Sequence, residues 1–220
     1  MNRSVVTTKD GSSTIFVPEL DEHYHSVHGA LQESMHVFIK AGLHYFTARN
    51  PLYILEVGFG TGLNALLTSV EVNGSSQKIH YSSLEKYPVH PTELEQLNYA
   101  QNLSADAQLT FKKLHSTPWE IESEINPNFY LTKLQADLKE FSATEQFDLI
   151  YFDAFAPSAQ ANLWTIDIFE RMYKALNAGG MLVTYCVKGE VRRNMQAAGF
   201  TVEKIPGPPG KREMARAHKA

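Results

Sequence analysis

The sequence predicts an α/β fold in which a mostly parallel, doubly wound sheet carries helices on both faces. Short apolar runs at 52–57, 147–155 and 181–187 suit buried strands, and they alternate with segments of helical periodicity. A series of β–α units of this kind forms a parallel sheet covered by helices. The last two strand-like segments are joined by a Pro/Gly-rich loop, so we expect them to add an antiparallel edge.

Residues 1–50 are expected to form an N-terminal extension with a hairpin and a helix. Residues 4–17 alternate around a Lys9-Asp10-Gly11 turn, which is typical of a β-hairpin. Residues 29–48 carry apolar side chains at helical spacing, namely Leu31, Met35, Phe38, Ile39 and Leu43. Pro51 then starts the α/β core, which is predicted to span 51–220.

The core elements follow one another in β–α order. Strands are expected at 52–57, 79–85, 147–155, 181–187, 200–205 and 213–218, with two more around the Asn126-Pro127-Asn128 turn within 119–137. Helices are expected at 91–101, which begins with a proline, at 165–176, which Asn177 and the Gly179-Gly180 pair would end, and at 188–199, which ends at Gly199.

Composition excludes several classes of protein. The chain has 220 residues, of which 43% are hydrophobic and 20% charged, as in ordinary globular domains. No apolar run approaches the roughly 20 residues of a membrane span, and no signal-peptide core precedes residue 17, so we expect a cytoplasmic protein. The single cysteine, Cys186, excludes an internal disulfide framework and is expected to be a small strand residue.

Charge is distributed unevenly. The net charge of -4 argues against non-specific nucleic-acid binding, but the C-terminal part is basic. From Lys188 onward three glutamates stand against eight basic residues, which are Lys188, Arg192, Arg193, Lys204, Lys211, Arg212, Arg216 and Lys219. This segment is either a solvated surface or a face that binds phosphates.

Residues 55–67, "LEVGFGTGLNALL", place three glycines where a strand becomes a helix. Gly58, Gly60 and Gly62 alternate with larger residues, which indicates a turn whose backbone lies close to a ligand. The Gly-x-Gly-x-Gly spacing differs from the Gly-x-Gly-x-x-Gly of dinucleotide-binding turns, which hold a pyrophosphate. With Glu56 before it, the turn suits a ligand that has no phosphate at this point.

Two acidic residues follow later strands. Glu85 ends the strand at 79–85, where a carboxylate can accept hydrogen bonds from both hydroxyls of a ribose. Asp137 follows the strands at 119–137, where it either contacts an adenine amino group or caps a helix that starts at "DLKEF". Together with the glycines, these residues indicate a nucleoside cofactor.

Asp153 ends the strand at 147–155 on the ligand side, and Phe155 and Pro157 follow it. A carboxylate beside an aromatic wall suits a planar substrate that carries a basic amine. Asp153 can hold the ammonium and take its proton when the neutral nitrogen attacks an electrophile, which makes it the candidate catalytic residue.

The sequence also allows other interpretations. His23, His25 and His28 are metal-ligating residue types, but a loop leaves their rings unconstrained and no further ligands complete a shell, so no metal is expected. A non-catalytic module that binds a nucleoside cofactor remains an alternative, although it has no need for Asp153.

Five segments together resemble one family: "LEVGFGTGLNALL", "LEKYP", "FDLIYFDAFAP" with "NLWT", "GKREM", and the N-terminal "YHSVHGALQESMHVFI". The family is that of the methyltransferase domain of MnmC, a bifunctional enzyme of tRNA wobble-uridine modification, and of its stand-alone form, MnmD. The resemblance covers roughly residues 10–216. It implies a Rossmann-like class I fold, S-adenosylmethionine as the cofactor, and methylation of the amine of 5-aminomethyl(-2-thio)uridine in the anticodon region of tRNA. A methyltransferase of this kind that acts on another amine is the alternative.

Roles for single residues follow from the same resemblance. Gly58, Gly60 and Gly62 would line the methionine and ribose, Glu85 would hold the ribose, and Asp137 would contact the adenine. Asp153 would face the substrate amine, and Tyr24 and Glu33 would close over the methionine end. The basic "GKREM" segment, with Lys211 and Arg212, would favour the nucleic-acid substrate, as Phe155 and Pro157 would favour the planar base.

The sequence departs from the family in two ways. His25 replaces the usual aromatic residue beside Tyr24, and Ser34 stands where threonine is common. The bifunctional members also carry a flavin-dependent oxidase domain that removes a carboxymethyl group, for which 220 residues leave no room. A separate flavin-dependent oxidase, or upstream wobble-uridine enzymes, are therefore expected to supply the free amine.

Overall fold

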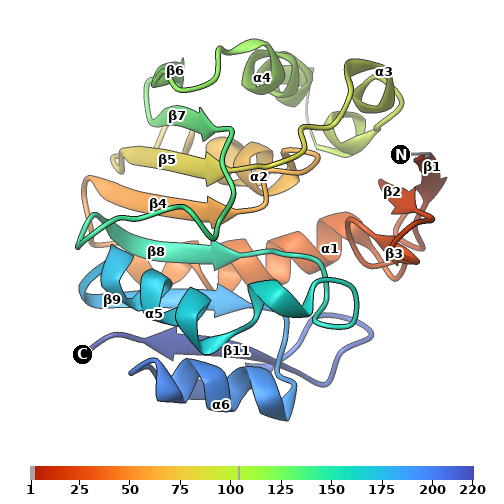
Figure 1. Ribbon diagram of the computed structural model, residues 1–220. Helices are drawn as coiled ribbons and strands as arrows, with labels where there is room; N and C mark the ends of the chain where they lie inside the picture. The colour runs from red at the N-terminus through yellow and green to blue at the C-terminus, as the bar shows by residue number, and fades with distance from the viewer. Residues whose placement is uncertain (1–2, 104) are drawn as a thin grey trace.

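The larger of two sheets forms the centre of the molecule (Figure 1). The computed structural model describes residues 3–103 and 105–220. The eight strands of the larger sheet have the order β10-β11-β9-β8-β4-β5-β7-β6. The five central strands pair in parallel, whereas β10–β11, β11–β9 and β6–β7 pair antiparallel. The predicted mostly parallel sheet with an antiparallel edge is confirmed.

The strand positions agree closely with the sequence patterns. Their bounds are β4 Leu52–Val57, β5 Ile79–Leu84, β6 Ser123–Asn126, β7 Phe129–Leu134, β8 Phe147–Phe152, β9 Leu176–Thr184, β10 Thr201–Pro206 and β11 Glu213–His218. The expectation that Gly179 and Gly180 lie between a helix and a strand was wrong. Both lie within β9, which starts directly after the helix and has a register irregularity opposite Phe147–Leu149.

Helices cover the sheet from two sides, and two separate apolar clusters result. On one side, α2 (Leu63–Val72) and α4 (Ala105–Ser116) pack on strand residues such as Ile54 and Tyr151. On the other side, α5 (Ile166–Ala175) and α6 (Gly189–Ala197) pack on residues such as Leu55 and Ile150. Alternate residues of one strand thus enter different clusters, as the period-2 geometry of a strand requires.

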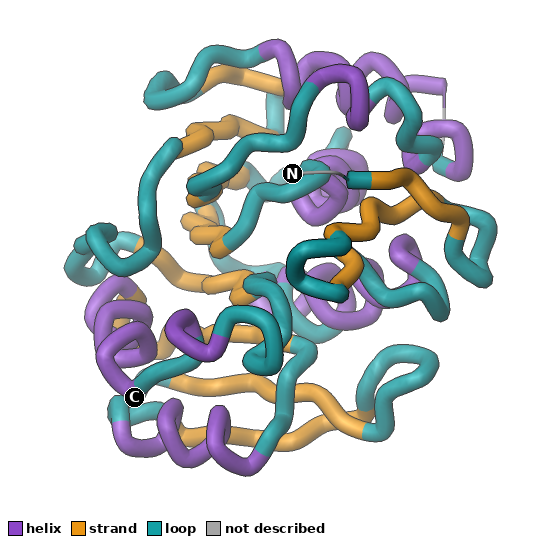
Figure 2. Tube along the Cα trace, turned by 45° about the vertical axis from the view of Figure 1, so that its right-hand side comes forward, coloured by secondary structure: helices purple, strands orange, loops and turns teal. Residues whose placement is uncertain are grey.

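The N-terminal 50 residues form the predicted hairpin and helix. β1 (Ser4–Thr7) and β2 (Ser13–Val17) pair antiparallel, and a short β3 (Glu22–His23) completes a three-stranded sheet. The predicted helix consists of α1 (Ala30–Ser34), a π-helical segment (Met35–Lys40) and a 3-10 turn (Leu43–Phe46). Figures 1 and 2 place the small sheet at the edge where the parallel strands end. A domain boundary near residue 50 remains a prediction.

Two helices differ from expectation. The segment 91–101 is not one helix but α3 (Pro91–Leu94), which His90 caps, followed by a 3-10 turn (Tyr99–Asn102). The helix α4 was not predicted, although Ala107, Phe111 and Leu114 have helical spacing and pack into the core.

The crossover from β7 to β8 also departs from the doubly wound pattern. Residues 135–146, all of them described, form turns and no helix. In Figure 1 the face of β4, β5 and β7 that is turned away from α2 is therefore not covered by a helix. The prediction of helices on both faces is thus correct for only part of the sheet. Among the described residues, no helix combines the length and apolar character needed to cross a membrane.

Candidate functional site

One cavity of about 980 Å³ opens at the carboxyl ends of the central strands. The chain proceeds from β4 to β5 on one side and from β8 to β9 on the other, so the strand order reverses between β4 and β8. Ligands of open α/β sheets bind at such a switch point. The N-terminal segment supplies one wall of this cavity, through residues such as Tyr24 and Glu33.

The glycine-rich turn after β4 needs glycine at all three positions. Gly58, Gly60 and Gly62 have φ values of 91°, 51° and 73°, which side chains disfavour. A Cβ on Gly58 would lie 2.9 Å from the Asp153 carbonyl oxygen, and one on Gly60 would lie 3.0 Å from the Tyr24 ring. Gly58 and Gly60 line the cavity.

The structure does not bring Gly62 to the cavity. Gly62 is the N-cap of α2, and a Cβ there would lie 3.0 Å from Nε2 of His115. The same imidazole nitrogen is 3.1 Å from the Thr61 carbonyl oxygen, so His115 braces the turn from behind. Burial lowers the pKa of His115 to about 4, which keeps the ring neutral. Gly62 is therefore needed because His115 packs against it. Its position does not support the predicted contact with a cofactor.

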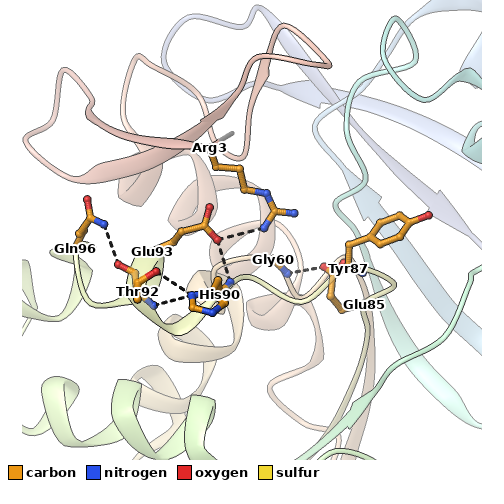
Figure 3. Close-up of polar contacts among 8 residues, drawn as sticks. All are labelled: Arg3, Gly60, Glu85, Tyr87, His90, Thr92, Glu93 and Gln96. Carbon is orange, nitrogen blue, oxygen red and sulfur yellow. Dashed lines mark hydrogen bonds and ion pairs between the residues drawn. The ribbon is translucent and has the colours of Figure 1, made fainter. Parts of the chain in front are cut away.

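Glu85 is held directly against the glycine-rich turn (Figure 3). Its Oε2 accepts a hydrogen bond of 2.9 Å from the Gly60 N–H, and its Oε1 accepts one of 2.7 Å from the Tyr87 N–H. Glu85 lines the cavity. Each carboxylate oxygen has two acceptor sites, so both oxygens can still accept from the hydroxyls of a ligand.

Asp137 lines the same side of the cavity. Its carboxylate accepts from Lys86 Nζ at 2.8 Å and from the Lys139 N–H at 2.9 Å. The hydrogen bond from Lys86 holds the pKa of Asp137 below its ordinary value. The carboxylate thus caps a turn at 138–140 that does not continue into a helix. The predicted adenine contact is compatible with this position and remains a prediction.

Glu56 lies behind the cavity wall and not in it. The residue is fully buried, its Oε2 accepts from Ser83 Oγ at 2.6 Å, and its Oε1 accepts from Asn64 Nδ2 at 3.0 Å. Burial raises the pKa of Glu56 to about 8, so the carboxyl group is largely protonated at neutral pH. Direct contact of Glu56 with a cofactor is not supported by this placement.

Asp153 follows β8 and reaches the cavity. Its Oδ2 accepts a hydrogen bond of 2.8 Å from Asn64 Nδ2, and no described residue donates to its Oδ1. Burial raises the pKa of Asp153 to about 7, while the hydrogen bond from Asn64 opposes this shift. A carboxyl group that titrates near neutrality can exchange a proton under ordinary conditions.

Sequence reasoning missed Asn64, which bridges Glu56 and Asp153. The signal was present, because Asn64 is a polar residue in the otherwise apolar start of α2, two positions after the last glycine. Its side chain is 2% exposed and lines the cavity wall. Buried donors are normally hydrogen-bonded, and Nδ2 of Asn64 has two acceptors here.

The N-terminal wall brings the remaining predicted residues together. Tyr24 and Phe155 pack edge to face with ring centroids 5.0 Å apart. Glu33 accepts from the Ser26 N–H at 2.9 Å and from Lys211 Nζ at 2.5 Å. Pro157 and Arg212 also line the cavity.

Lys211 therefore points inward and not to solvent. Its Nζ lies 3.9 Å from the centroid of the Tyr185 ring, and the Tyr185 hydroxyl donates to the Ala154 carbonyl oxygen at 2.8 Å. The loop between β10 and β11 is thus joined to α1 across the cavity. Lys211 is thus part of the cavity wall. To bind a substrate, it would have to leave or share its ion pair with Glu33.

The three histidines near the N-terminus have different surroundings. His23 packs on Phe16, His25 is buried with its ring 5.9 Å from that of Tyr99, and His28 lies against Gly210. Burial lowers the pKa of His25 to about 4. The absence of a metal remains a prediction.

The fold and the site define a Rossmann-like protein that binds a nucleoside-containing cofactor beside an enclosed carboxyl group. Residues 94–220 match the family described as S-adenosyl-L-methionine-dependent methyltransferase, and the chain belongs to this family. S-adenosylmethionine is therefore its cofactor.

Similar proteins carry more specific names. The chain is 31% identical over 227 residues to the tRNA 5-methylaminomethyl-2-thiouridine biosynthesis bifunctional protein MnmC of Cupriavidus metallidurans, which covers 98% of this chain and 34% of the relative. The protein of the same name from Cupriavidus necator is 30% identical, with 90% and 32% covered. The chain thus spans about a third of these relatives. The crystal structure of MNMC2 from Aquifex aeolicus superposes with a TM-score of 0.76 at 26% identity, covering 98% of this chain and 70% of that one.

The residues present fit S-adenosylmethionine. Gly58 and Gly60 present their backbone to the cavity, Glu85 has free acceptor sites, and the cavity volume of about 980 Å³ is at the upper end for small-molecule sites. The carboxylate of Glu33 suits a positively charged group, and Tyr24 with Phe155 offers aromatic surface.

Proposed function

We propose that this protein transfers a methyl group to the amine of 5-aminomethyl(-2-thio)uridine at the wobble position of tRNA. The observation that carries the proposal is Asp153, whose carboxyl group faces the cavity with one free oxygen, has a pKa raised to about 7, and lines the same cavity as Phe155. The names of the relatives, which refer to 5-methylaminomethyl-2-thiouridine biosynthesis in tRNA, support the choice of substrate.

The residues of the chain have separate tasks in this proposal. Glu85 would hold the ribose, Gly58 and Gly60 would lie along the ribose and methionine, and Asp137 would accept from the adenine amino group. Glu33 and Tyr24 would enclose the methionine end. The cofactor, when bound, supplies a methyl group activated for attack by a nitrogen nucleophile.

Asp153 would act on the substrate amine. An aminomethyl group is mostly protonated in water, and it becomes a nucleophile only when the proton leaves. The free Oδ1 of Asp153 can accept a hydrogen bond from the ammonium and then take the proton as nitrogen attacks. Phe155, beside it, would pack on the uracil ring and hold the amine in line, because such alignment supplies much of the rate.

The basic residues around the opening suit an RNA substrate. Lys188 and Arg212 line the cavity, and Arg192 and Arg193 lie on α6 next to Lys188. Contacts of such residues with phosphates would make binding fall steeply as salt rises. The substrate is a primary amine, so an activity that exposes this amine acts before methylation. We infer that a flavin-dependent oxidase or upstream wobble-uridine enzymes provide it.

Mass spectrometry of nucleosides tests the proposal. The protein is incubated with S-adenosylmethionine and tRNA whose wobble uridine carries an aminomethyl group, and the digested nucleosides are analysed. The expected result is a mass gain of one methyl group on 5-aminomethyl(-2-thio)uridine. Methylation of another amine, with no gain on this nucleoside, would favour a different amine substrate; cofactor binding with no transfer to any amine would favour a non-catalytic module.

A further inference from the structure

The side-chain amide of Asn64 connects two carboxyl groups that belong to different strands. Its Nδ2 lies 2.8 Å from Asp153 Oδ2 and 3.0 Å from Glu56 Oε1. Glu56 lies on β4 and Asp153 follows β8, so the bridge crosses the switch point of the sheet. An amide nitrogen has two N–H groups, and each can serve one of these acceptors.

We propose that Asn64 is the positioning residue of the reaction centre, because its amide fixes one oxygen of Asp153 and leaves the other oxygen for the substrate amine. The proposal rests on the proposed amine methylation. Glu56 serves as the fixed end of the bridge, since Ser83 Oγ holds it at 2.6 Å and it is fully buried. The bridge therefore anchors Asp153 to the core of the sheet.

The second consequence of the bridge is electrostatic. A hydrogen bond donated to a carboxylate favours the ionised form, which is the form of Asp153 that can take a proton. Other groups also act on Asp153: burial and Glu33 raise its pKa, and Lys211 lowers it. The charge of Asp153 in turn helps to raise the pKa of three neighbouring groups, which are the hydroxyls of Tyr185 and Tyr81 and the carboxyl group of Glu56.

Loss of the bridge should therefore change the pH dependence of the reaction and not only its rate. The test substitution is Asn64→Leu, which keeps the approximate size and removes both donors. The acidic limb of the kcat profile should move to higher pH by about one to two units, since a hydrogen bond to a charged group has about that effect on a pKa. Asn64→Ser, with a single donor, should move it less.

The matched control is Asn126→Leu. Asn126 also ties a strand to α2, through hydrogen bonds of 3.2 and 2.9 Å from its Nδ2 to the Ser69 carbonyl and hydroxyl oxygens, but it contacts neither carboxyl group. This variant should keep the pH profile of the unaltered protein. Thermal unfolding of all three variants shows whether each is folded; if Asn64→Leu does not fold, Asn64→Ser provides the readout.

Two outcomes would overturn the role of Asn64: an equal loss of kcat at every pH, which a merely structural residue produces, or a limb that moves to lower pH. Carboxyl NMR titration of Asp153 without substrate separates this proposal from the function. If its pKa rises in the Asn64 variants while the unaltered protein methylates no amine, the proposed function fails and the bridge stands. If the pKa stays unchanged, the bridge has no electrostatic effect and the proposal fails.

Discussion

The two sides of the cavity hold their carboxylates in different ways. On the side of Glu85, a partly exposed carboxylate is fixed by two backbone N–H groups that belong to its own turn and to the neighbouring glycine-rich turn. On the side of Asp153, two carboxyl groups share one buried amide, and burial raises both pKa values, to about 7 for Asp153 and about 8 for Glu56. The first arrangement keeps a carboxylate ready to bind hydroxyls, whereas the second produces a group that can exchange protons.

This difference predicts that substitutions on the two sides separate binding from chemistry. Changes at Glu85 should weaken binding of the cofactor, while changes at Asp153 should slow transfer of the methyl group.

The largest effect is expected for Asp153→Asn. An amide cannot take the proton of the amine, so kcat should fall roughly 100- to 10,000-fold, the usual contribution of a general base. The affinity for S-adenosylmethionine, measured by calorimetry, should stay nearly unchanged. A variant that methylates at the normal rate with saturating substrate would refute the assigned role.

Glu85→Gln should act on the other side of the cavity. The amide is a weaker acceptor, and its NH₂ group would face the N–H of Gly60 or Tyr87. The Kd of the cofactor should rise about 10- to 100-fold, as the loss of hydrogen bonds to a charged group implies. At saturating cofactor kcat should recover. A large fall of kcat with an unchanged Kd would contradict the division between the two sides.

Glu56→Gln should change how stability depends on pH. The native pKa of Glu56, about 8, exceeds its ordinary value of 4.5, so between these values the folded state binds more protons than the unfolded state. Stability attributable to Glu56 is then complete below about pH 4.5 and is lost as pH rises to about 8, by an amount on the order of a few kcal/mol. The variant should therefore gain melting temperature relative to the unaltered protein at about pH 8 and not at about pH 5. Equal effects at both pH values would be inconsistent with a protonated native Glu56.

Gly62→Ala tests the support of the glycine-rich turn. Gly62 has a φ of 73° and its new Cβ would lie 3.0 Å from His115, so the loss of stability should reach about 1–3 kcal/mol. Gly74→Ala is a matched control, because Gly74 has a φ of 74° and open space around it. Chemical denaturation should show a smaller loss for Gly74. Equal losses of stability in the two variants would mean that the contact with His115 does not contribute to the cost of the Gly62 substitution.

The smallest effect is expected for Lys86→Met. Lys86 is exposed and its ion pair with Asp137 is a surface pair, so the midpoint of thermal unfolding should hardly move. The pKa of Asp137 should rise toward its ordinary value, because the hydrogen bond from Lys86 is the main cause of its lowering. A carboxyl NMR titration measures this change, and an unaltered pKa would show that the pair is not formed in solution.

Local patterns in the sequence were sufficient for the fold and for one side of the cavity. Short apolar runs, strand-like segments and turn residues located the strands of the large sheet, and the ends of two of these strands located Glu85 and Asp153. These features depend on residues that are close in sequence. The missed helix α4 also had a local signal, in the spacing of Ala107, Phe111 and Leu114.

The other side of the cavity depends on contacts between distant segments. Asn64 and Asp153 are separated by 89 residues and Glu33 and Lys211 by 178, so no local pattern could pair them. The glycines show the same limit. Their spacing predicted a turn, but only the structure shows that Gly62 packs on His115 while Gly60 lies at the cavity.

Asp153 is the group on which both the proposed reaction and the role of Asn64 depend. The most direct measurement is a titration of its side-chain carboxyl carbon by NMR, assigned with Asp153→Asn. We predict a pKa of about 7, raised by burial beside the cavity. A value near 3.8, that of an ordinary aspartate, would contradict an enclosed group that takes a proton from the substrate amine.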